Sequence, residues 1–171
     1  MSFFYISQML IVAAIFFDLI SFYFKGRGSI VACLFCSGVL VATHFALLEQ
    51  WTAATLMVLA TFRYLTSVFS TSPKLMFWFC GLSILAAAYT YAGLVSILSC
   101  SGAIFQTMAA FKKEGERLRQ LMMVGAACWI LNNYLVHSPA AVAMEILFFV
   151  SNLAAYYHDY MRKKPRQSWE Q

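Results

Sequence analysis

Charged residues are scarce in this chain. Asp, Glu, Lys and Arg together make up 11% of its 171 residues, whereas hydrophobic residues make up 62%. A soluble domain of this size covers its surface with far more charge. The connections between the apolar stretches are too short to form a soluble domain. The composition therefore excludes an ordinary soluble protein and indicates an integral membrane protein.

Proline is also scarce, with three residues in the chain. Pro73 and Pro139 each follow a serine at the start of an apolar stretch. Proline suits the first turn of a helix, and the preceding serine suits the N-cap. The sequence contains no glycine-rich phosphate loop, and its first apolar stretch lacks the basic flank and cleavage site of a signal peptide. We therefore expect that stretch to be a membrane span.

The five cysteines do not form a recognisable metal or redox motif. Cys33 and Cys36 are separated by two residues, but no second pair completes a zinc site. All five lie inside apolar stretches, where small apolar packing residues are the simpler interpretation. We predict no disulfide, no metal and no cofactor. The cysteines are Cys33, Cys36, Cys80, Cys100 and Cys128.

Seven apolar stretches fill the chain, each close to the ~20 residues that a helix needs to cross ~30 Å of hydrocarbon. They predict an all-α membrane protein with seven transmembrane helices. The stretches cover residues 2–24, 29–48, 50–70, 75–91, 94–111, 120–137 and 139–160.

The basic residues are placed asymmetrically between these stretches. Of the twelve Lys and Arg residues, all except Arg63 follow the first, third, fifth or seventh stretch. With seven crossings these places share one face, so the positive-inside rule puts the N-terminus outside and the C-terminus in the cytoplasm. The net charge of +5 is then explained by anionic lipid headgroups, and we expect the lipid bilayer and no nucleic acid as a partner.

The chain also contains a weak internal repeat. An offset of 89 residues sets His44 opposite Asn133 and Arg63 opposite Asn152. The first three and last three stretches then run in the same direction, as in parallel membrane repeats. We predict a first triple-helix bundle over 1–70, an inverting linker helix over 71–93, a second bundle over 94–160, and a basic cytoplasmic tail over 161–171.

Ionisable side chains at membrane depth are costly and require a reason. Asp18 and Arg63 lie at similar depths in stretches that run in the same direction, so we expect them to pair. The pair has two interpretations. One is that it holds a bundle together, and the other is that Asp18 orients Arg63 as the anchor of an anionic or hydrogen-bonding substrate. The two are compatible, because a substrate can compete for the same guanidinium.

A second group of polar residues lies nearer the outer face. Glu145 is expected either to be protonated or to pair with His44, and such a pair would be a proton relay or an interhelical hydrogen bond. Asn133 lies beside them, while Gln106 and Asn152 lie deeper and are expected to face protein or a cavity.

Trp129 lies in the middle of its stretch, away from the interfaces where an aromatic belt is expected from Trp51, Trp78, Tyr89, Tyr91, Tyr156 and Tyr157. Its indole is suited to be a stacking wall for a ring-shaped ligand, with ordinary packing as the alternative.

These residues resemble the YgjV-type family of bacterial inner-membrane proteins. The resemblance covers residues 8 to 160 and rests on Thr43-His44-Phe45-Ala46-Leu47-Leu48, Arg63, Cys128-Trp129-Ile130, Asn133, Glu145 and Asn152. That family is in turn distantly similar to the MtN3-like group of SWEET and PQ-loop transporters. The group's 3+1+3 arrangement implies the same two bundles and a linker helix for this chain.

Two departures from the SWEET pattern stand out. The first helix of each bundle lacks the proline of those transporters, and Arg63 occupies a position where SWEET proteins carry a pocket asparagine. The resemblance therefore implies a substrate with a carboxylate or phosphate more than a neutral sugar.

We therefore expect a small-solute transporter of the bacterial inner membrane that works by alternating access. Substrate contact is predicted for Arg63, Asn152, Trp129, Asn133 and Gln106, and charge or proton coupling for Asp18, His44 and Glu145. The alternative is a receptor or assembly protein that uses the same cavity for recognition. The sequence contains no nucleophile–base set, so we do not expect an enzyme. A monomer and a homo-oligomer are both compatible with this chain.

Overall fold

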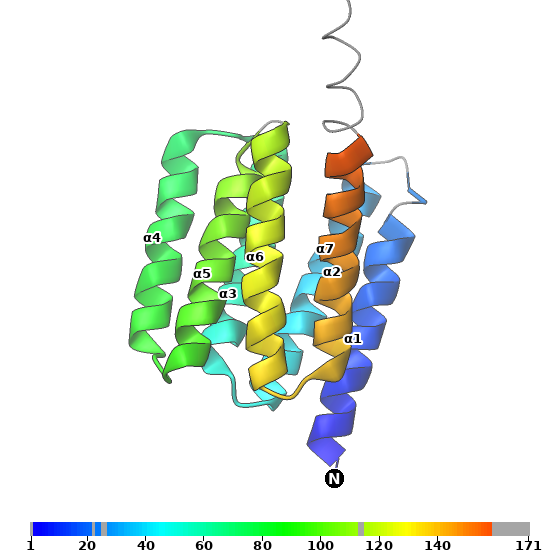
Figure 1. Ribbon diagram of the computed structural model, residues 1–171, viewed down its shortest axis with the longest axis vertical. Helices are drawn as coiled ribbons and strands as arrows, with labels where there is room; N and C mark the ends of the chain where they lie inside the picture. Colours follow the sequence, from blue (N-terminus) through cyan, green and yellow to red (C-terminus); the bar gives the residue numbers. More distant parts are fainter. Residues whose placement is uncertain (1, 22, 25–26, 113–114, 159–171) are drawn as a thin grey trace, which may run out of the picture.

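The computed structural model describes residues 2–21, 23–24, 27–112 and 115–158. These residues form seven α-helices that stand side by side (Figure 1). The helices are α1 (Ser2–Ser21), α2 (Arg27–Leu47), α3 (Trp51–Phe69), α4 (Pro73–Tyr89), α5 (Leu94–Ala110), α6 (Glu116–Leu135) and α7 (Pro139–Tyr156).

The helix bounds agree with the predicted stretches to within four residues at every end. The largest differences are at α6, which begins at Glu116 although its apolar stretch begins at 120, and at α7, which ends at Tyr156. Hydropathy marks only the apolar part of a helix, whereas the charged first turn of α6 is helical too. The predicted basic tail over 161–171 lies outside the described residues.

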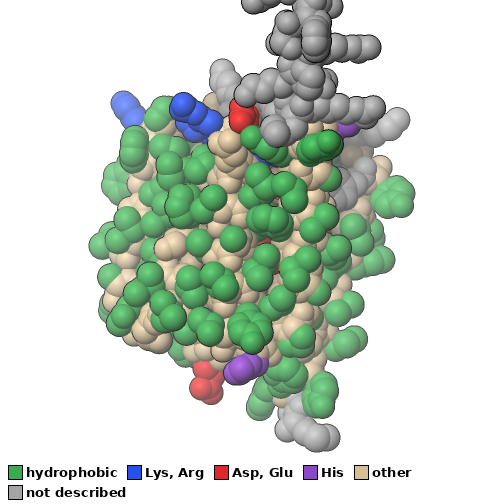
Figure 2. All heavy atoms as spheres, in the orientation of Figure 1, with side chains coloured by type: hydrophobic (Ala, Val, Ile, Leu, Met, Phe, Trp, Pro, Cys, Tyr) green, Lys and Arg blue, Asp and Glu red, His purple; other side chains and the backbone are tan. Residues whose placement is uncertain are grey.

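Four of the helices are long and apolar enough to cross a membrane: α1, α2, α3 and α7. Helices α4 and α5 are apolar but have 17 residues each, which corresponds to about 26 Å at the usual rise of a helix. Together these elements give an all-helical, multi-pass membrane protein. Its outward-facing surface is accordingly rich in large apolar side chains (Figure 2).

Six of the helices are packed in a closed ring. Helix α2 packs between α1 and α3, and α6 packs between α5 and α7. Contacts of α3 with α5 and of α1 with α7 join these two groups. Helix α4 lies outside the ring against α3 and α5 (Figure 1). Each group of three is consecutive in sequence, because short connections make sequence neighbours pack side by side.

Lys and Arg side chains gather at one end of the bundle (Figure 2). This is the end where α7 finishes, and the opposite end shows acidic and histidine side chains. The distribution agrees with the asymmetry expected from the sequence. Below, the two are called the basic end and the N-terminal end.

The two connections at the N-terminal end repeat each other. Glu49 and His137, 88 residues apart, are the two non-glycine residues with positive φ among those that the structure describes, at 57° and 55°. In the α2–α3 connection the amide of Gln50 donates to the carbonyl of Phe45 at 2.9 Å. In the α6–α7 connection the amide of Ser138 donates to the carbonyl of Asn133, also at 2.9 Å. The register here is therefore 88 rather than 89, and Asn133 corresponds to Phe45 instead of His44.

Helices α5 and α6 approach each other closely at two glycines. A Cβ on Gly102 would lie 2.8 Å from Cδ1 and Nε1 of Trp129 and 3.2 Å from the carbonyl oxygen of Gly125. A Cβ on Gly125 would lie 2.8 Å from Cγ of Gln106. Small residues commonly allow such close packing of membrane helices. Here they also leave the space that the Trp129 indole fills.

Substitution of Gly102 by Ala should therefore lower the melting temperature of the purified protein in detergent. Overpacking of this kind costs about 1–3 kcal/mol. Gly81→Ala is the matched control, because a Cβ on Gly81 in α4 has nothing within 4 Å and alanine favours the helix. Equal melting temperatures for the two variants would contradict the close contact.

Candidate functional site

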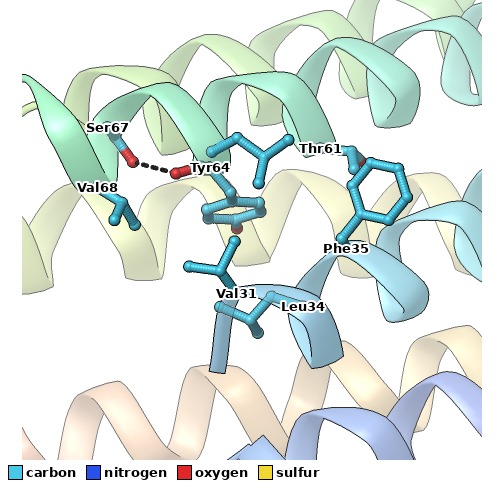
Figure 3. Close-up of a pocket in the computed structure, with 8 residues that line it drawn as sticks. Val31, Leu34, Phe35, Thr61, Tyr64, Ser67 and Val68 are labelled. Carbon is cyan, nitrogen blue, oxygen red and sulfur yellow. Dashed lines mark hydrogen bonds between the residues drawn. The ribbon is translucent and has the colours of Figure 1, made fainter. Parts of the chain in front are cut away.

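A small groove lies on the bundle between α2 and α3 (Figure 3). Its volume is about 50 Å³, far below the ~300 Å³ at which pockets for small molecules begin. Its lining is mainly apolar, so the groove is not a solute site. It is lined by Val31, Leu34, Phe35, Thr61, Tyr64, Leu65, Ser67 and Val68.

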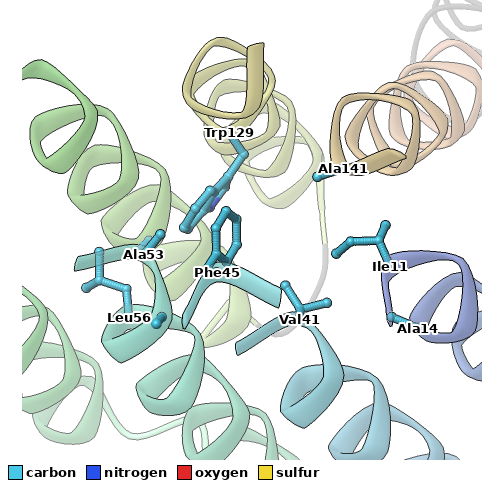
Figure 4. Packing of buried hydrophobic residues seen from close by; sticks show 10 residues of the cluster. Ile11, Ala14, Val41, Phe45, Ala53, Leu56, Trp129 and Ala141 are labelled. Atoms are coloured by element: carbon cyan, nitrogen blue, oxygen red, sulfur yellow. The ribbon is translucent and has the colours of Figure 1, made fainter. Parts of the chain in front are cut away.

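The centre of the ring holds a cluster of buried apolar side chains, to which all six ring helices contribute (Figure 4). The rings of Phe45 and Trp129 face each other at its middle, with centroids 5.6 Å apart and planes inclined by 34°. Most of the cluster lies in the half of the bundle nearer the N-terminal end. Its members are Ile11, Ala14, Val41, Phe45, Ala53, Ala54, Leu56, Ala103, Trp129 and Ala141.

Trp129 thus takes the packing role that was the alternative to a stacking wall. Its side chain is 0% exposed and lies between Phe45 and Gly102. Its Nε1 has no hydrogen-bond partner in the part of the chain that the structure describes. In this conformation the indole closes the centre of the ring.

His44 joins α1 to the α6–α7 connection. Its Nδ1 lies 2.9 Å from the carbonyl oxygen of Ser7 and must donate, because a carbonyl only accepts. Its Nε2 then accepts from the hydroxyl of Ser138 at 3.2 Å. Gln8 extends the network, since its Nε2 donates to Ser138 at 3.3 Å and its Oε1 accepts from the amide of Ala140 at 3.1 Å.

This network corrects two expectations. The predicted pair of His44 with Glu145 is wrong, because Ser7 and Ser138 occupy both ring nitrogens. Ser138 precedes α7 as predicted, but its hydroxyl makes no capping bond there, and neither does that of Ser72 before α4. Ser138 instead stabilises the seam between α1 and α7.

The seam between α3 and α5 is closed at the same end by hydroxyl groups. Thr52 Oγ1 lies 2.7 Å from Ser96 Oγ and donates to the carbonyl of Thr90 at 2.6 Å. Ser96 also accepts from the amide of Ala92 at 2.9 Å. Both seams of the ring are therefore hydrogen-bonded at the N-terminal end.

Arg63 lies buried between α3 and α5, with 1% of its surface exposed. Its Nη1 donates to Thr107 Oγ1 at 2.9 Å and, more weakly, to the carbonyl of Ala103 at 3.4 Å. The ring of Tyr64 lies under the guanidinium, 4.6 Å from its Cζ. Nε and Nη2 have no hydrogen-bond partner among the described residues.

The predicted ion pair of Asp18 with Arg63 is also wrong. The two residues do lie at similar depths, but α2 packs between α1 and α3 and separates them. Asp18 lies instead beside Ser37 of α2 and within electrostatic range of Glu145 on α7. Glu145 has one carboxylate oxygen, Oε2, that is buried without a partner in the described structure.

The remaining predicted residues are buried but do not meet in one place. Asn152 accepts from Arg119 at 3.1 Å and donates to the carbonyl of Phe148 at 2.9 Å, which ties α7 to α6. Gln106 packs against Gly125. Asn133 Oδ1 accepts from the side-chain Nδ2 of its neighbour Asn132 at 3.4 Å.

A comparison with protein families supplies the identification. The model of the Imp-YgjV family of bacterial inner membrane proteins matches residues 5–163. The chain belongs to this family. The resemblance expected from the sequence is thereby confirmed, and the protein is a multi-pass protein of the bacterial inner membrane. Comparisons with curated proteins and with solved structures returned no match.

Several polar residues of this family member were missed by the sequence analysis. Thr107 accepts a hydrogen bond from Arg63, which lies 44 residues earlier in the sequence. No local sequence pattern predicts such a contact. Ser7 and Ser96 take part in the seams. Both are uncharged serines within apolar stretches, so their sequence positions did not distinguish them.

Replacement of His44 by Ala should lower the melting temperature in detergent, because it removes the two hydrogen bonds by which the imidazole joins Ser7 to Ser138. A typical hydrogen bond contributes about 0.5–1.5 kcal/mol to stability. His137→Asn is the matched control, since His137 is exposed and asparagine tolerates its positive φ. If both variants melt like the wild type, the network does not stabilise the seam.

Proposed function

We propose that this protein is a small-solute carrier that works by alternating access, with Arg63 as the anchor for a carboxylate-, phosphate- or hydroxyl-bearing substrate. The observation that carries the proposal is the buried guanidinium of Arg63, two of whose nitrogens have no hydrogen-bond partner among the described residues. An ionisable residue inside a membrane is costly and typically marks a substrate or ion pathway.

The depth of this group supports the proposal. Thr107 lies 11 residues beyond Ser96 of the α3–α5 seam, and Asp18 lies 11 residues beyond Ser7 of the α1–α7 seam. At the usual helix rise, both residues are about 16 Å further into the bundle than the seam serines. This depth is close to the middle of a ~30 Å hydrocarbon layer. Carriers built from repeats bind their substrates at this depth.

The closed N-terminal end supports it as well. Alternating access requires a state in which one end is sealed while the other admits the substrate. The two hydrogen-bonded seams and the contact of Phe45 with Trp129 seal the N-terminal end of this conformation. In this proposal His44, Trp129 and Asn133 serve the seal rather than contacting substrate.

The proposed architecture is the SWEET-like 3+1+3 arrangement, with bundles over 1–70 and 94–160 and the linker helix over 71–93. All seven helices cross the membrane, with the N-terminus outside. Asn152 and Gln106 supply polar contacts to the substrate path, and Asp18 with Glu145 adjusts its charge.

A receptor or assembly protein is the second candidate. The apolar cluster fills the centre of the ring, and a protein that only recognises a partner has no need to open it. Transport across a sealed vesicle separates the two candidates, because a receptor binds solute without moving it.

The orientation predicts which engineered cysteines react with a membrane-impermeant maleimide in a background without the native cysteines. In cells with a permeabilised outer membrane and an intact inner membrane, Glu49→Cys should be labelled and Lys112→Cys should be protected. Both should react after the inner membrane is opened. Labelling of Lys112→Cys alone while the inner membrane is intact would reverse the proposed orientation.

A panel of sugars, sugar acids, nucleosides and vitamin precursors should contain a compound that raises the melting temperature of the wild type but not of Arg63→Gln. A ligand that binds only the folded state must stabilise it. The same compound, radiolabelled, should then enter proteoliposomes that contain wild-type protein. Binding without uptake would favour the receptor, and the absence of any stabilising compound would remove the main support for both candidates.

A further inference from the structure

The unpartnered nitrogens of Arg63 lie along one edge of the guanidinium. Nη1 already donates to Thr107 and Ala103, which leaves Nε and Nη2. The N–H bonds of these two nitrogens point in the same direction from the plane's long edge. This edge is the side-on fork that binds two oxygens of one carboxylate or phosphate group.

We infer that the unpartnered edge of Arg63 is a bidentate fork for a single oxyanion group, a carboxylate or a phosphate, rather than for a hydroxyl group or a simple anion. This group enters when the covered edge is opened. This inference rests on the proposed function and narrows its substrate class. The reasons are the fixed position of the guanidinium, its burial and the geometry of its free edge.

The guanidinium is fixed on two sides. The hydroxyl of Thr107 donates its proton to the carbonyl of Ala103 at 2.6 Å, so its lone pairs face Arg63 and accept from Nη1. The ring of Tyr64 covers one face of the plane. A group held in this way loses little conformational entropy when it binds an oxyanion, and such preorganisation increases affinity.

Burial makes an anionic partner necessary. A guanidinium stays charged in proteins, and with 1% of its surface exposed its charge needs compensation nearby. The carboxylates of Asp18 and Glu145 belong to α1 and α7, which pack on the other side of the ring from α3. Among the described residues none supplies an oxygen to the fork.

Geometry then selects the ligand. A carboxylate or phosphate offers two oxygens at the spacing of the Nε and Nη2 hydrogens and forms two parallel hydrogen bonds. Chloride offers charge without this pattern, and a sugar hydroxyl offers one oxygen without charge. Lysine at position 63 would keep the charge but not the fork. The oxyanion has two possible sources, a dissolved solute or the phosphate of a lipid headgroup.

The test measures melting temperatures in a sugar-based detergent that carries no phosphate. The proteins are wild type, Arg63→Lys and Thr107→Val, and the probes are inorganic phosphate, acetate and benzoate, with chloride at equal ionic strength and glucose as controls. Native mass spectrometry of the same samples detects retained phosphatidylglycerol. We expect at least one oxyanion to stabilise the wild type by several degrees more than chloride does.

The variants separate the fork from the charge. Arg63→Lys should abolish the oxyanion-specific shift, and Thr107→Val should weaken the apparent affinity several-fold, because the guanidinium is then no longer held. If the dissolved probes fail but phosphatidylglycerol stays bound to the wild type and is lost from Arg63→Lys, the fork binds a lipid phosphate.

Two results would overturn the inference. One is an equal response of wild type and Arg63→Lys, and the other is the absence of both a dissolved oxyanion and a bound phospholipid. Failure of the proposed function looks different. If an oxyanion binds with the expected variant pattern but is not taken up by proteoliposomes, the fork stands and the carrier does not. If the wild type takes up a neutral solute and the Arg63→Lys variant takes it up equally well, the carrier stands and the fork does not.

Discussion

Two rows of hydrogen bonds close the helix ring at its N-terminal end, and the rest of the structure depends on them. One row runs from Ser7 through His44 to Ser138, and the other joins Thr52 to Ser96. Lipid gives helices no hydrophobic reason to associate, so polar contacts and close packing must hold them together. Both rows lie at seams between the consecutive groups of helices, where the ring would otherwise be open.

Close packing completes what the hydrogen bonds begin. Gly102 and Gly125 bring α5 and α6 together, and the space beside Gly102 receives the indole of Trp129. Trp129 in turn meets Phe45 from the other group. The apolar cluster therefore seals the same half of the bundle in which the seams are bonded.

Two buried ionisable side chains have incomplete hydrogen bonding. Arg63 uses one of its three nitrogens and Glu145 leaves Oε2 unused among the described residues. A folded protein rarely tolerates such groups in its interior unless they serve a function. A membrane interior raises their cost further, and this cost is the physical basis of the binding site that we propose at Arg63.

The site was less predictable than the fold, and the residues show why. Asp18, Arg63, His44 and Glu145 were correctly singled out as the ionisable groups within the apolar stretches, but both pairings proposed for them were wrong. Depth along a helix can be read from sequence, whereas the neighbour of a helix face cannot. Helix α2 lies between Asp18 and Arg63. His44 forms hydrogen bonds with Ser7 and Ser138, two uncharged residues that the sequence did not distinguish as its partners.

The sequence by itself determined the class of this protein, its seven helices, the separation of basic residues to one end and the family to which it belongs. These properties follow from local composition, because hydropathy and charge act on each segment separately. Only the tertiary structure decided the order of helices around the ring, the position of Trp129 in the seal and the contact of Arg63 with Thr107. These depend on which faces of distant helices meet, and packing of the whole chain is what fixes them.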